Sequence, residues 1–393
     1  MSPDNSDAVI AGITDLLPVL RQRAQETEDG RVVPAESVKA LEETGFFKLL
    51  QPRSAGGLEA DPVAFYTAVR LIASACGSTG WVASVVGVHP WQLALFPPQA
   101  QGDVWGADPA TRMSSSYAPT GKAKKLDSGY RLDGRWSFSS GCDHATWVLL
   151  GGIVTNDEGQ PTDFRTFLLP ASDYAIDDVW DTVGLRGTGS NDIVVDNAFV
   201  PEHRSLSFTN VTRCACPGQE VNTGALYRIP FGSIFSYAIT TPVIGMATGA
   251  YAAHVDYQRG RVRASYVGQK SAEDPFAQVR IAEAAALIDA AWLALERDMT
   301  ELMAHARAAE KIPLPLRLRT RRDQVTGTGQ AIRAVDLLFE NSGGRALKMG
   351  TPIQRFWRDA HAGRVHAIND PERALSMFGR GEFGHDVPPD AMF

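Results

Sequence analysis

Apolar residues recur at spacings of three and four along the first third of the chain, in AVIAGITDLLPVLRQRA and again in ESVKALEETGFFKLL. This spacing places apolar side chains on one face of a helix. The pair Gly56 and Gly57 interrupts the pattern, and a new helix is predicted near Asp61 and Pro62, where a capping residue precedes a proline. The pattern therefore predicts an N-terminal helical domain over residues 1–112.

The spacing changes to two between about residues 113 and 205. The segments YRLDGRWSFS, TWVLLGGIV, FRTFLLP and NDIVVDNAFV are bounded by Gly, Asp, Asn and Pro, which is typical of short strands. After a predicted loop at about 209–224, long helical stripes return and indicate a packed bundle. The order predicted is an N-terminal helical domain, a central β domain over 113–224 and a C-terminal helical bundle over 225–393.

The composition is that of a globular protein, and the net charge disfavours some classes of binding partner. The chain has 393 residues, of which 44% are hydrophobic and 21% charged, so it can bury a large core. A net charge of -7 disfavours nucleic acid and anionic membranes as partners. No secretion signal and no apolar run of about 18 residues is present, so a cytoplasmic protein is expected. The basic run from Arg317 to Arg322 is expected to be a solvated helix face.

Several common catalytic and metal motifs are missing from the sequence. Four scattered cysteines make neither a disulfide framework nor a zinc site, and no metal is expected. The glycine-rich segment GLRGTGSND, residues 184–192, precedes a β-branched stretch that ends at Pro201, so it is not a dinucleotide-binding loop. Two interpretations of this segment stay open: a tight turn between strands, or a loop that shapes a ligand pocket.

The segment WSFSSGCDHATW, from Trp136 to Trp147, carries the most informative chemistry. Ser139, Ser140 and Gly141 end a predicted strand beside aromatic residues. Hydroxyl and backbone N–H groups there can bond a flat heteroaromatic ring, and Trp or Phe can stack on it. The alternative interpretation is a core tryptophan in an ordinary β domain.

Taken together, these segments resemble the acyl-CoA dehydrogenase superfamily, and more narrowly its flavin-dependent monooxygenases. The segments that carry the resemblance span the chain: ETGFFKLLQPRSAGG, ACGSTGWVASVVGVHPW, SSSYAP, WSFSSGCDHATW, GLRGTGSNDIVVDNAFVP and PIQRFWRDAHAGRVHAINDPERA. The sequence is most similar to oxygenases that convert a phenolic secosteroid into a catechol, with p-hydroxyphenylacetate hydroxylases as more distant relatives. The resemblance implies a mainly α fold with an N-terminal helical domain, a middle β-barrel or sandwich, and a C-terminal four-helix bundle.

The resemblance also implies which residues hold the flavin. Trp81 and Ser140 match positions that pack on the flavin ring and hydrogen-bond near its N5, with Gly141 alongside. Phe138 stands where relatives often have Trp. Arg261 resembles an arginine that reaches the flavin phosphate, although a surface salt bridge is its alternative role.

A second group of matched positions surrounds the aromatic substrate. His89, Ser115 or Ser116, and His366 fall in this group. His366 is expected to be catalytic, because a histidine can take a phenol proton near neutral pH. Its alternative role is a histidine on a helix surface or in the core.

The function implied is ortho-hydroxylation of a phenol to a catechol through a flavin C4a-hydroperoxide, with Ser140 and the aromatic wall protecting the adduct. Reduced FMN or FAD would come from a separate NADH-dependent reductase, O₂ would be the oxidant, and the enzyme would be a homotetramer. The alternatives are a hydroxylase of another phenol, a flavin N-hydroxylase, an acyl-CoA dehydrogenase and a flavin-binding scaffold without activity. Dehydrogenation is disfavoured because no carboxylate stands shortly after Arg358 and Asp359, where many dehydrogenases have their base.

Overall fold

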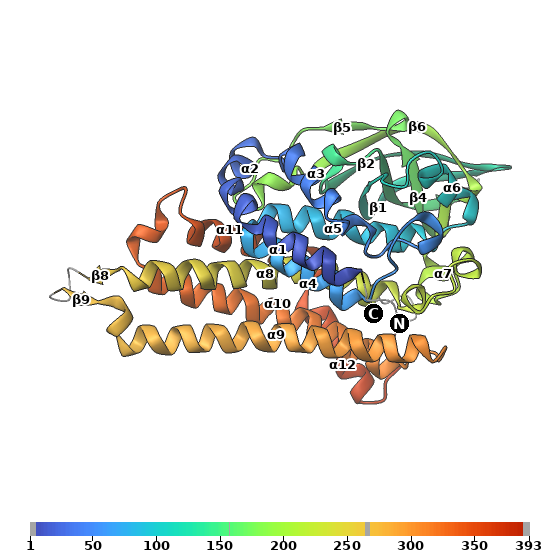
Figure 1. Ribbon diagram of the computed structural model, residues 1–393. Coiled ribbons are helices and arrows are strands. Elements are labelled where there is room, and N and C mark those ends of the chain that lie inside the picture. Colours follow the sequence, from blue (N-terminus) through green and yellow to red (C-terminus); the bar gives the residue numbers. More distant parts are fainter. Residues whose placement is uncertain (1–4, 157, 264–267, 388–393) are drawn as a thin grey trace.

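The computed structural model describes residues 5–156, 158–263 and 268–387. Figure 1 shows the N-terminal helices and the β domain lying along one side of a long helical bundle. Helices come first, strands follow and helices return, so the predicted order of elements and the implied fold class are confirmed.

The N-terminal helices are α1 (Ser6–Gln22), α2 (Ala24–Gly30), α3 (Ala35–Glu43), α4 (Pro62–Ala75), α5 (Gly77–Leu93) and α6 (Pro98–Trp105). The strands of the β domain are β1 (Met113–Leu126), β2 (Gly129–Ser139), β3 (Trp147–Thr155), β4 (Pro161–Pro170), β5 (Ala175–Asp177), β6 (Asn191–Pro201) and β7 (Ser205–Ser207). The remaining elements are α7 (Phe208–Thr212), α8 (Phe231–Arg259), β8 (Val262–Arg263), β9 (Gln269–Lys270), α9 (Pro275–Arg307), α10 (Leu314–Ser342), α11 (Pro352–Arg364) and α12 (Pro371–Glu382). Short 3₁₀ turns include η5 (Arg186–Thr188), η7 (Pro217–Glu220) and η12 (Ala367–Asn369).

The β domain is one mixed sheet of seven strands in the order β5-β6-β2-β1-β3-β4-β7. Strands β1 and β3 run parallel, and the other neighbours are antiparallel. One buried cluster fills this domain around Trp136, whose Nε1 donates to the Gly151 carbonyl at 2.7 Å. Trp136 is fully buried and its indole proton has a partner, so it is a core residue.

Helix α5 is the centre of the molecule. Every residue from Gly77 to Leu93 is buried, so this helix has no solvent-facing side. Its close approach to α4 requires a glycine, because a Cβ on Gly80 would lie 2.3 Å from the Ala73 Cβ. Its polar side chains bond outward to neighbouring segments: the Ser84 hydroxyl donates to the Ala238 carbonyl at 2.5 Å, and Trp91 Nε1 donates to the Leu226 carbonyl at 2.9 Å.

The basic run of α10 corrects the expectation of a solvated face. Arg321 is only 5% exposed, and Arg319 lies within 3.2 Å of Asp298, whose side chain is fully buried on α9. Tyr237 of α8 also donates to Asp298, at 2.9 Å. The prediction was wrong because the partners lie on other elements: Arg319 pairs with the buried Asp298 of α9, and Arg321 donates to the Ile368 carbonyl.

The segment predicted as a loop at 209–224 contains α7 and η7. In η7 the Cys216 amide donates to Gln219 Oε1 at 2.7 Å, and Gln219 Nε2 donates to the Tyr227 carbonyl at 2.7 Å. These bonds fix a turn that the composition of the segment did not reveal. No helix in the described ranges is both long and apolar enough to span a bilayer.

A polar junction joins the β domain to α11. The Leu185 amide donates to Asp359 Oδ1 at 2.7 Å, and Arg358 donates to the Val183 carbonyl at 2.7 Å. Burial raises the pKa of Asp359 to about 6. The two backbones touch at Gly184, where a Cβ would lie 2.2 Å from the Arg358 carbonyl oxygen. The glycine is required by this close approach.

We expect Gly184→Ala to lower the thermal unfolding midpoint, because the added methyl group must push the loop away from α11 at a cost of about 1–3 kcal/mol. Gly344→Ala is the matched control, since a Cβ there meets nothing within 4 Å. Thermal unfolding followed by circular dichroism checks this. Equal midpoints for the two variants would contradict the tight contact.

Candidate active site

A chain of hydrogen bonds links α5 to the end of β2. Trp81, 5% exposed, donates from Nε1 to Ser140 Oγ at 3.1 Å. Ser140 Oγ lies 2.6 Å from Ser190 Oγ, which lies 2.6 Å from Thr188 Oγ1. Thr188 in turn donates to the Leu185 carbonyl at 2.9 Å. Indole and hydroxyl groups from three separate segments are thereby fixed relative to one another.

A β-bulge turns the end of β2 outward. The pairing with β6 shifts register between Trp136 and Ser139, and Phe138 takes a positive φ of 70°. Its ring is 68% exposed and meets the Trp180 ring edge-on at 6.1 Å. A large residue in the left-handed region is strained, and such strain is concentrated at functional sites. The result is an open aromatic surface next to Ser140.

Gly141 allows the close approach of this turn to α5. A Cβ at Gly141 would lie 3.0 Å from the nearest methyl carbons of Val82 and Val86, and the residue has a φ of 73°. Its amide donates to the Thr188 carbonyl at 2.9 Å. The strand-end pattern predicted free N–H groups here, but the Gly141 N–H is occupied, and Gly141 sets the position of Ser140.

His366 lies across from this chain, in the turn between α11 and α12. Its ring centroid is 5.9 Å from that of Trp81, and its Nδ1 accepts from the Ile368 amide at 3.2 Å. Burial lowers the pKa of His366 to about 4, so the ring is neutral at pH 7. With Nδ1 as an acceptor, the neutral ring carries its proton on Nε2. His366 is therefore set up to donate a hydrogen bond to a ligand oxygen, whereas the sequence led us to expect a proton acceptor.

His89 is the centre of a second, more enclosed group. It is fully buried, and burial lowers its pKa to about 3. Its Nδ1 lies 3.4 Å from the Tyr117 hydroxyl, while its Nε2 has no hydrogen-bond partner in the described part of the chain. The Phe231 and Phe235 rings stack at 4.9 Å, and both meet the Tyr117 ring edge-on. An unpaired buried nitrogen beside apolar rings is what a pocket for an aromatic ligand with one polar group provides.

Strand alternation separates the two candidate serines. Ser116 Oγ donates to the Ser137 carbonyl at 2.8 Å, within the sheet. Ser115 points the other way, to the face from which Met113 and Tyr117 pack on the helical core. Ser115 thus shares a face with the His89 group, and the Ser116 hydroxyl is engaged elsewhere.

Arg261 is not brought to these residues within one chain. It follows the last turn of α8, next to β8 at one end of the bundle (Figure 1), and donates to the Asn341 carbonyl at 2.8 Å. Its guanidinium also lies 5.5 Å from the Tyr257 ring centroid. The contacts described for Arg261 are with the end of the bundle and not with Trp81, Ser140 or His366.

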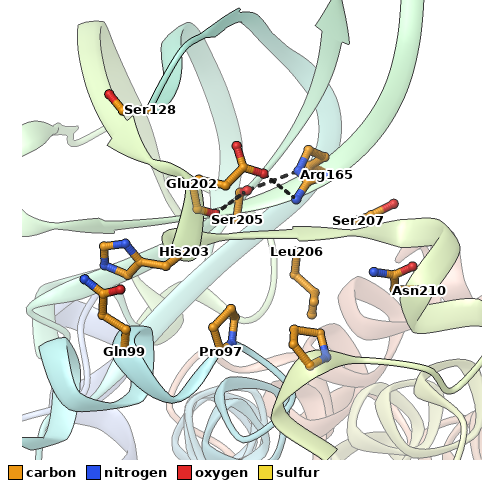
Figure 2. Close-up of a pocket in the computed structure, with 11 residues that line it drawn as sticks. Pro97, Gln99, Ser128, Arg165, Glu202, His203, Ser205, Leu206, Ser207 and Asn210 are labelled. Carbon is orange, nitrogen blue, oxygen red and sulfur yellow. Dashed lines mark hydrogen bonds and ion pairs between the residues drawn. The ribbon is translucent and has the colours of Figure 1, made fainter.

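The cavity in Figure 2 does not suit a flavin ring. It measures about 430 Å³ and lies between α6 and the strands β4 and β7. Arg165 there donates to Ser205 Oγ at 3.1 Å and pairs with Glu202 at 3.5 Å, so these polar groups satisfy one another. Among the described residues that line it there is no Phe, Tyr or Trp on which a flavin could stack. A second cavity, of about 790 Å³, lies between the 210–220 segment and the α9–α10 connection.

The carboxylates near α11 are engaged in structural roles. Asp370 Oδ1 accepts from the Glu372 amide at 3.1 Å and caps α12. Asp359 holds the Leu185 amide. In the described ranges no group of three His, Cys, Asp or Glu side chains could hold a metal. The structural roles of Asp359 and Asp370 disfavour α-proton removal by either carboxylate, the chemistry of a dehydrogenase.

Sequence reasoning missed part of the site. Ser190 and Thr188 lie in the glycine-rich segment 184–192, whose two open interpretations concerned its backbone and not its hydroxyls. Thr188 and Ser190 face one another because Thr188 ends the 3₁₀ turn η5 and Gly189 takes a left-handed conformation, which residue spacing does not reveal. Tyr117 and Trp180 were not singled out either.

The residues present fit an isoalloxazine ring. Phe138 and Trp180 offer an open aromatic surface, and Ser140 places a hydroxyl beside it. A flat heteroaromatic group with a polar edge needs this combination.

Comparison with known proteins identifies the family. Acyl-CoA dehydrogenase N-terminal and C-terminal domains match residues 17–110 and 237–371. The oxygenase subunit HsaA of a flavin-dependent monooxygenase from Rhodococcus jostii (strain RHA1) is 60% identical over 94% of this chain and 96% of its own length. The oxygenase component of an FADH(2)-dependent resorcinol hydroxylase from Rhizobium sp. (strain MTP-10005) is 38% identical over 95% of this chain and 93% of its length. The crystal structure of 3-HSA hydroxylase from Rhodococcus sp. RHA1 superposes with a TM-score of 0.94 at 57% identity, covering 98% of this chain and 99% of that one. The chain therefore belongs to the acyl-CoA dehydrogenase superfamily and, within it, to the oxygenase subunits of flavin-dependent monooxygenases.

Proposed function

We propose that this flavin-dependent monooxygenase hydroxylates a phenolic secosteroid ortho to its hydroxyl group, giving a catechol. The observation that carries the proposal is that Trp81, Ser140 and His366 meet at one site. Trp81 Nε1 donates to Ser140 Oγ at 3.1 Å, and the centroid of the neutral His366 ring lies 5.9 Å from that of Trp81. When bound, reduced FMN or FAD supplies two electrons to O₂, so that one oxygen atom enters the ring and the other leaves as water.

The chain's own residues bind, orient and exclude water. Trp81 and Phe138 form the wall on which the flavin ring packs, and Ser140 Oγ hydrogen-bonds its polar edge. His366 Nε2 donates to the phenol oxygen and thereby favours ionisation of the phenol, whose proton passes to bulk solvent as the substrate binds. The phenolate is the more electron-rich form of the substrate, so ionisation favours hydroxylation at the ortho carbon.

The group around His89 supports a large, mostly apolar substrate. Tyr117 contacts the buried His89, whose Nε2 is unpaired among the described residues, and the Phe231 and Phe235 rings pack on Tyr117. Apolar rings beside one unpaired polar atom suit a multi-ring molecule that ends in an oxygen function. The identity of 60% to a flavin-dependent monooxygenase subunit and the likeness to 3-HSA hydroxylase support the same class.

We also propose a separate NADH-dependent reductase as the source of reduced flavin, and a homotetramer as the working assembly. Relatives described as oxygenase subunits or components support a second component. In the tetramer, Arg261 from a neighbouring copy would reach the flavin phosphate. The exposed apolar residues Phe276 (77%) and Val279 (63%) at the start of α9 support an interface there.

We expect His366→Ala to lower the fraction of O₂ that becomes catechol by about 10²-fold, within the range found when such a group is removed. His366→Asn should retain more activity, because its amide still donates a hydrogen bond. Product and O₂ are measured together by chromatography and an oxygen electrode. Equal losses in both variants would point to proton abstraction and against donation.

The amount of catechol formed per O₂ consumed should not change between pH 6 and pH 8 because of His366. Its folded-state pKa of about 4 keeps the ring neutral throughout this window, and the neutral form is lost only as the pH falls toward 4. The ratio of catechol to O₂ across the pH range checks this. A transition in coupling near pH 6.5 that His366→Asn abolishes would contradict it.

Ser140→Ala should raise the share of O₂ released as hydrogen peroxide several-fold, because the polar edge of the flavin loses its hydrogen bond and water can enter. Ser139→Ala is the matched control. Its hydroxyl bonds to Ser114 Oγ at 3.2 Å on the other side of the strand. Hydrogen peroxide released per O₂ consumed is measured for both variants. Equal peroxide release from the two would contradict a role of Ser140 in protecting the flavin.

Arg261→Ala should weaken binding of reduced FMN about tenfold, equivalent to about 1.4 kcal/mol. Riboflavin lacks the phosphate, so its affinity should not change. Arg259→Ala is the control, since Arg259 is exposed and pairs with Asp256 at 3.2 Å. Anaerobic fluorescence titrations give these affinities, and equal losses for FMN and riboflavin would refute a phosphate contact.

A further inference from the structure

The turn that carries His366 is poorly held by apolar packing. Val365 before it is 81% exposed, Ala367 after it is exposed, and only Ile368 buries an apolar side chain there, at 7% exposure. The position of a histidine on such a turn must therefore be set by other interactions.

Asn369 supplies most of these interactions. Its side chain is fully buried, and its Oδ1 accepts from Gln324 Nε2 at 2.7 Å, Thr240 Oγ1 at 3.1 Å and Thr328 Oγ1 at 3.3 Å. Its Nδ2 donates to the Gly363 carbonyl at 2.9 Å. A single side chain thus ties the turn to α8, α10 and the end of α11.

The backbone of the turn that carries His366 is also held by several hydrogen bonds. The Asn369 amide donates to the His366 carbonyl at 2.8 Å, and Arg364 donates to the Asn369 carbonyl at 2.8 Å. Arg321 donates to the Ile368 carbonyl at 3.1 Å and also bonds to Gln324. Burial lowers the pKa of Arg321 to about 10, which still leaves it protonated at neutral pH.

This network is buried and costly to disturb. Gln324, Thr240 and Thr328 are all fully buried, and each takes part in the bonds described. Loss of one member leaves its partners unsatisfied away from water, at a cost of about 1–3 kcal/mol each. The turn is therefore held in one arrangement, and a displacement of about 1 Å at a reacting group can cost about 10²-fold in rate.

We infer that Asn369, with Gln324, Thr240 and Thr328, forms a buried polar clamp that positions His366 toward the phenol oxygen. These four are positioning residues and do not touch substrate or flavin. The inference rests on the proposed role of His366 and adds that its placement comes from a polar network beneath the turn.

The test is a double-mutant cycle between Asn369→Ala and His366→Ala, read as catechol formed per O₂ consumed. Asn369→Ala alone should lower this ratio at least tenfold. In the His366→Ala background it should change the ratio less than twofold, because Asn369 acts through the imidazole. Affinity for reduced flavin should stay within twofold of the parent's in both variants.

A second pair of variants guards against a protein that merely fails to fold. Thr240→Val removes one hydroxyl of the clamp and should lower coupling about threefold, while Thr240→Ser should restore it. Thr241→Val is the matched control: Thr241 is equally buried on α8, but its hydroxyl donates to the Tyr237 carbonyl at 2.6 Å. Thermal midpoints are measured alongside.

The possible results distinguish the proposed role of His366 from the proposed role of the clamp. If His366→Ala keeps the parent's coupling, the proposed role of His366 fails, and the clamp has nothing to position. If His366→Ala is impaired but Asn369→Ala and Thr240→Val are not, only the clamp is refuted. Equal losses from Asn369→Ala in both backgrounds, or from Thr240→Val and Thr241→Val, would also refute it.

Discussion

The rest of the structure depends on the complete burial of α5. A helix with no exposed residue must satisfy its polar side chains against neighbouring segments or leave them unpaired, as at His89 Nε2, because no water is available on an exposed face. The Trp81 indole can bond Ser140 only if the β domain is docked, and Trp91 can bond Leu226 only if the start of the bundle is in place. Burial of one helix thereby fixes the β domain and the bundle relative to each other, and the candidate flavin surface forms where they meet.

Hydrogen bonds hold both sides of the site, and close packing adds to them on one side. Trp81 and Ser140 are held by the hydrogen bonds that continue to Ser190 and Thr188. The Gly141 backbone also packs against methyl groups of Val82 and Val86. His366 rests mainly on hydrogen bonds, because its turn buries little apolar surface. Directional bonds fix the orientation of a group as well as its position, which is what a donor aimed at one oxygen atom needs.

The sequence predicted the architecture well because periodicity depends on local geometry. Spacings of three to four and of two separated the helices from the strands, and Asp61 and Pro62 marked the start of α4 correctly. The meeting of Trp81, Ser140 and His366 was expected from the family resemblance alone, since three distant segments contribute to it.

What could not be predicted depends on partners that are distant along the chain. Arg321 looked like part of a solvated face, yet Gln324 and the Ile368 carbonyl bind it in the interior. The tautomer of His366 depends on a backbone amide only two residues away, but no residue spacing reveals which ring nitrogen it meets.

Oxygen labelling tests the central claim most directly. The purified protein is mixed anaerobically with reduced flavin and a phenolic secosteroid, then exposed to ¹⁸O₂, and the product is examined by mass spectrometry. The account predicts a catechol that carries one ¹⁸O atom, with flavin oxidised in equal amount. Unchanged phenol, with all the oxygen recovered as hydrogen peroxide, would contradict it.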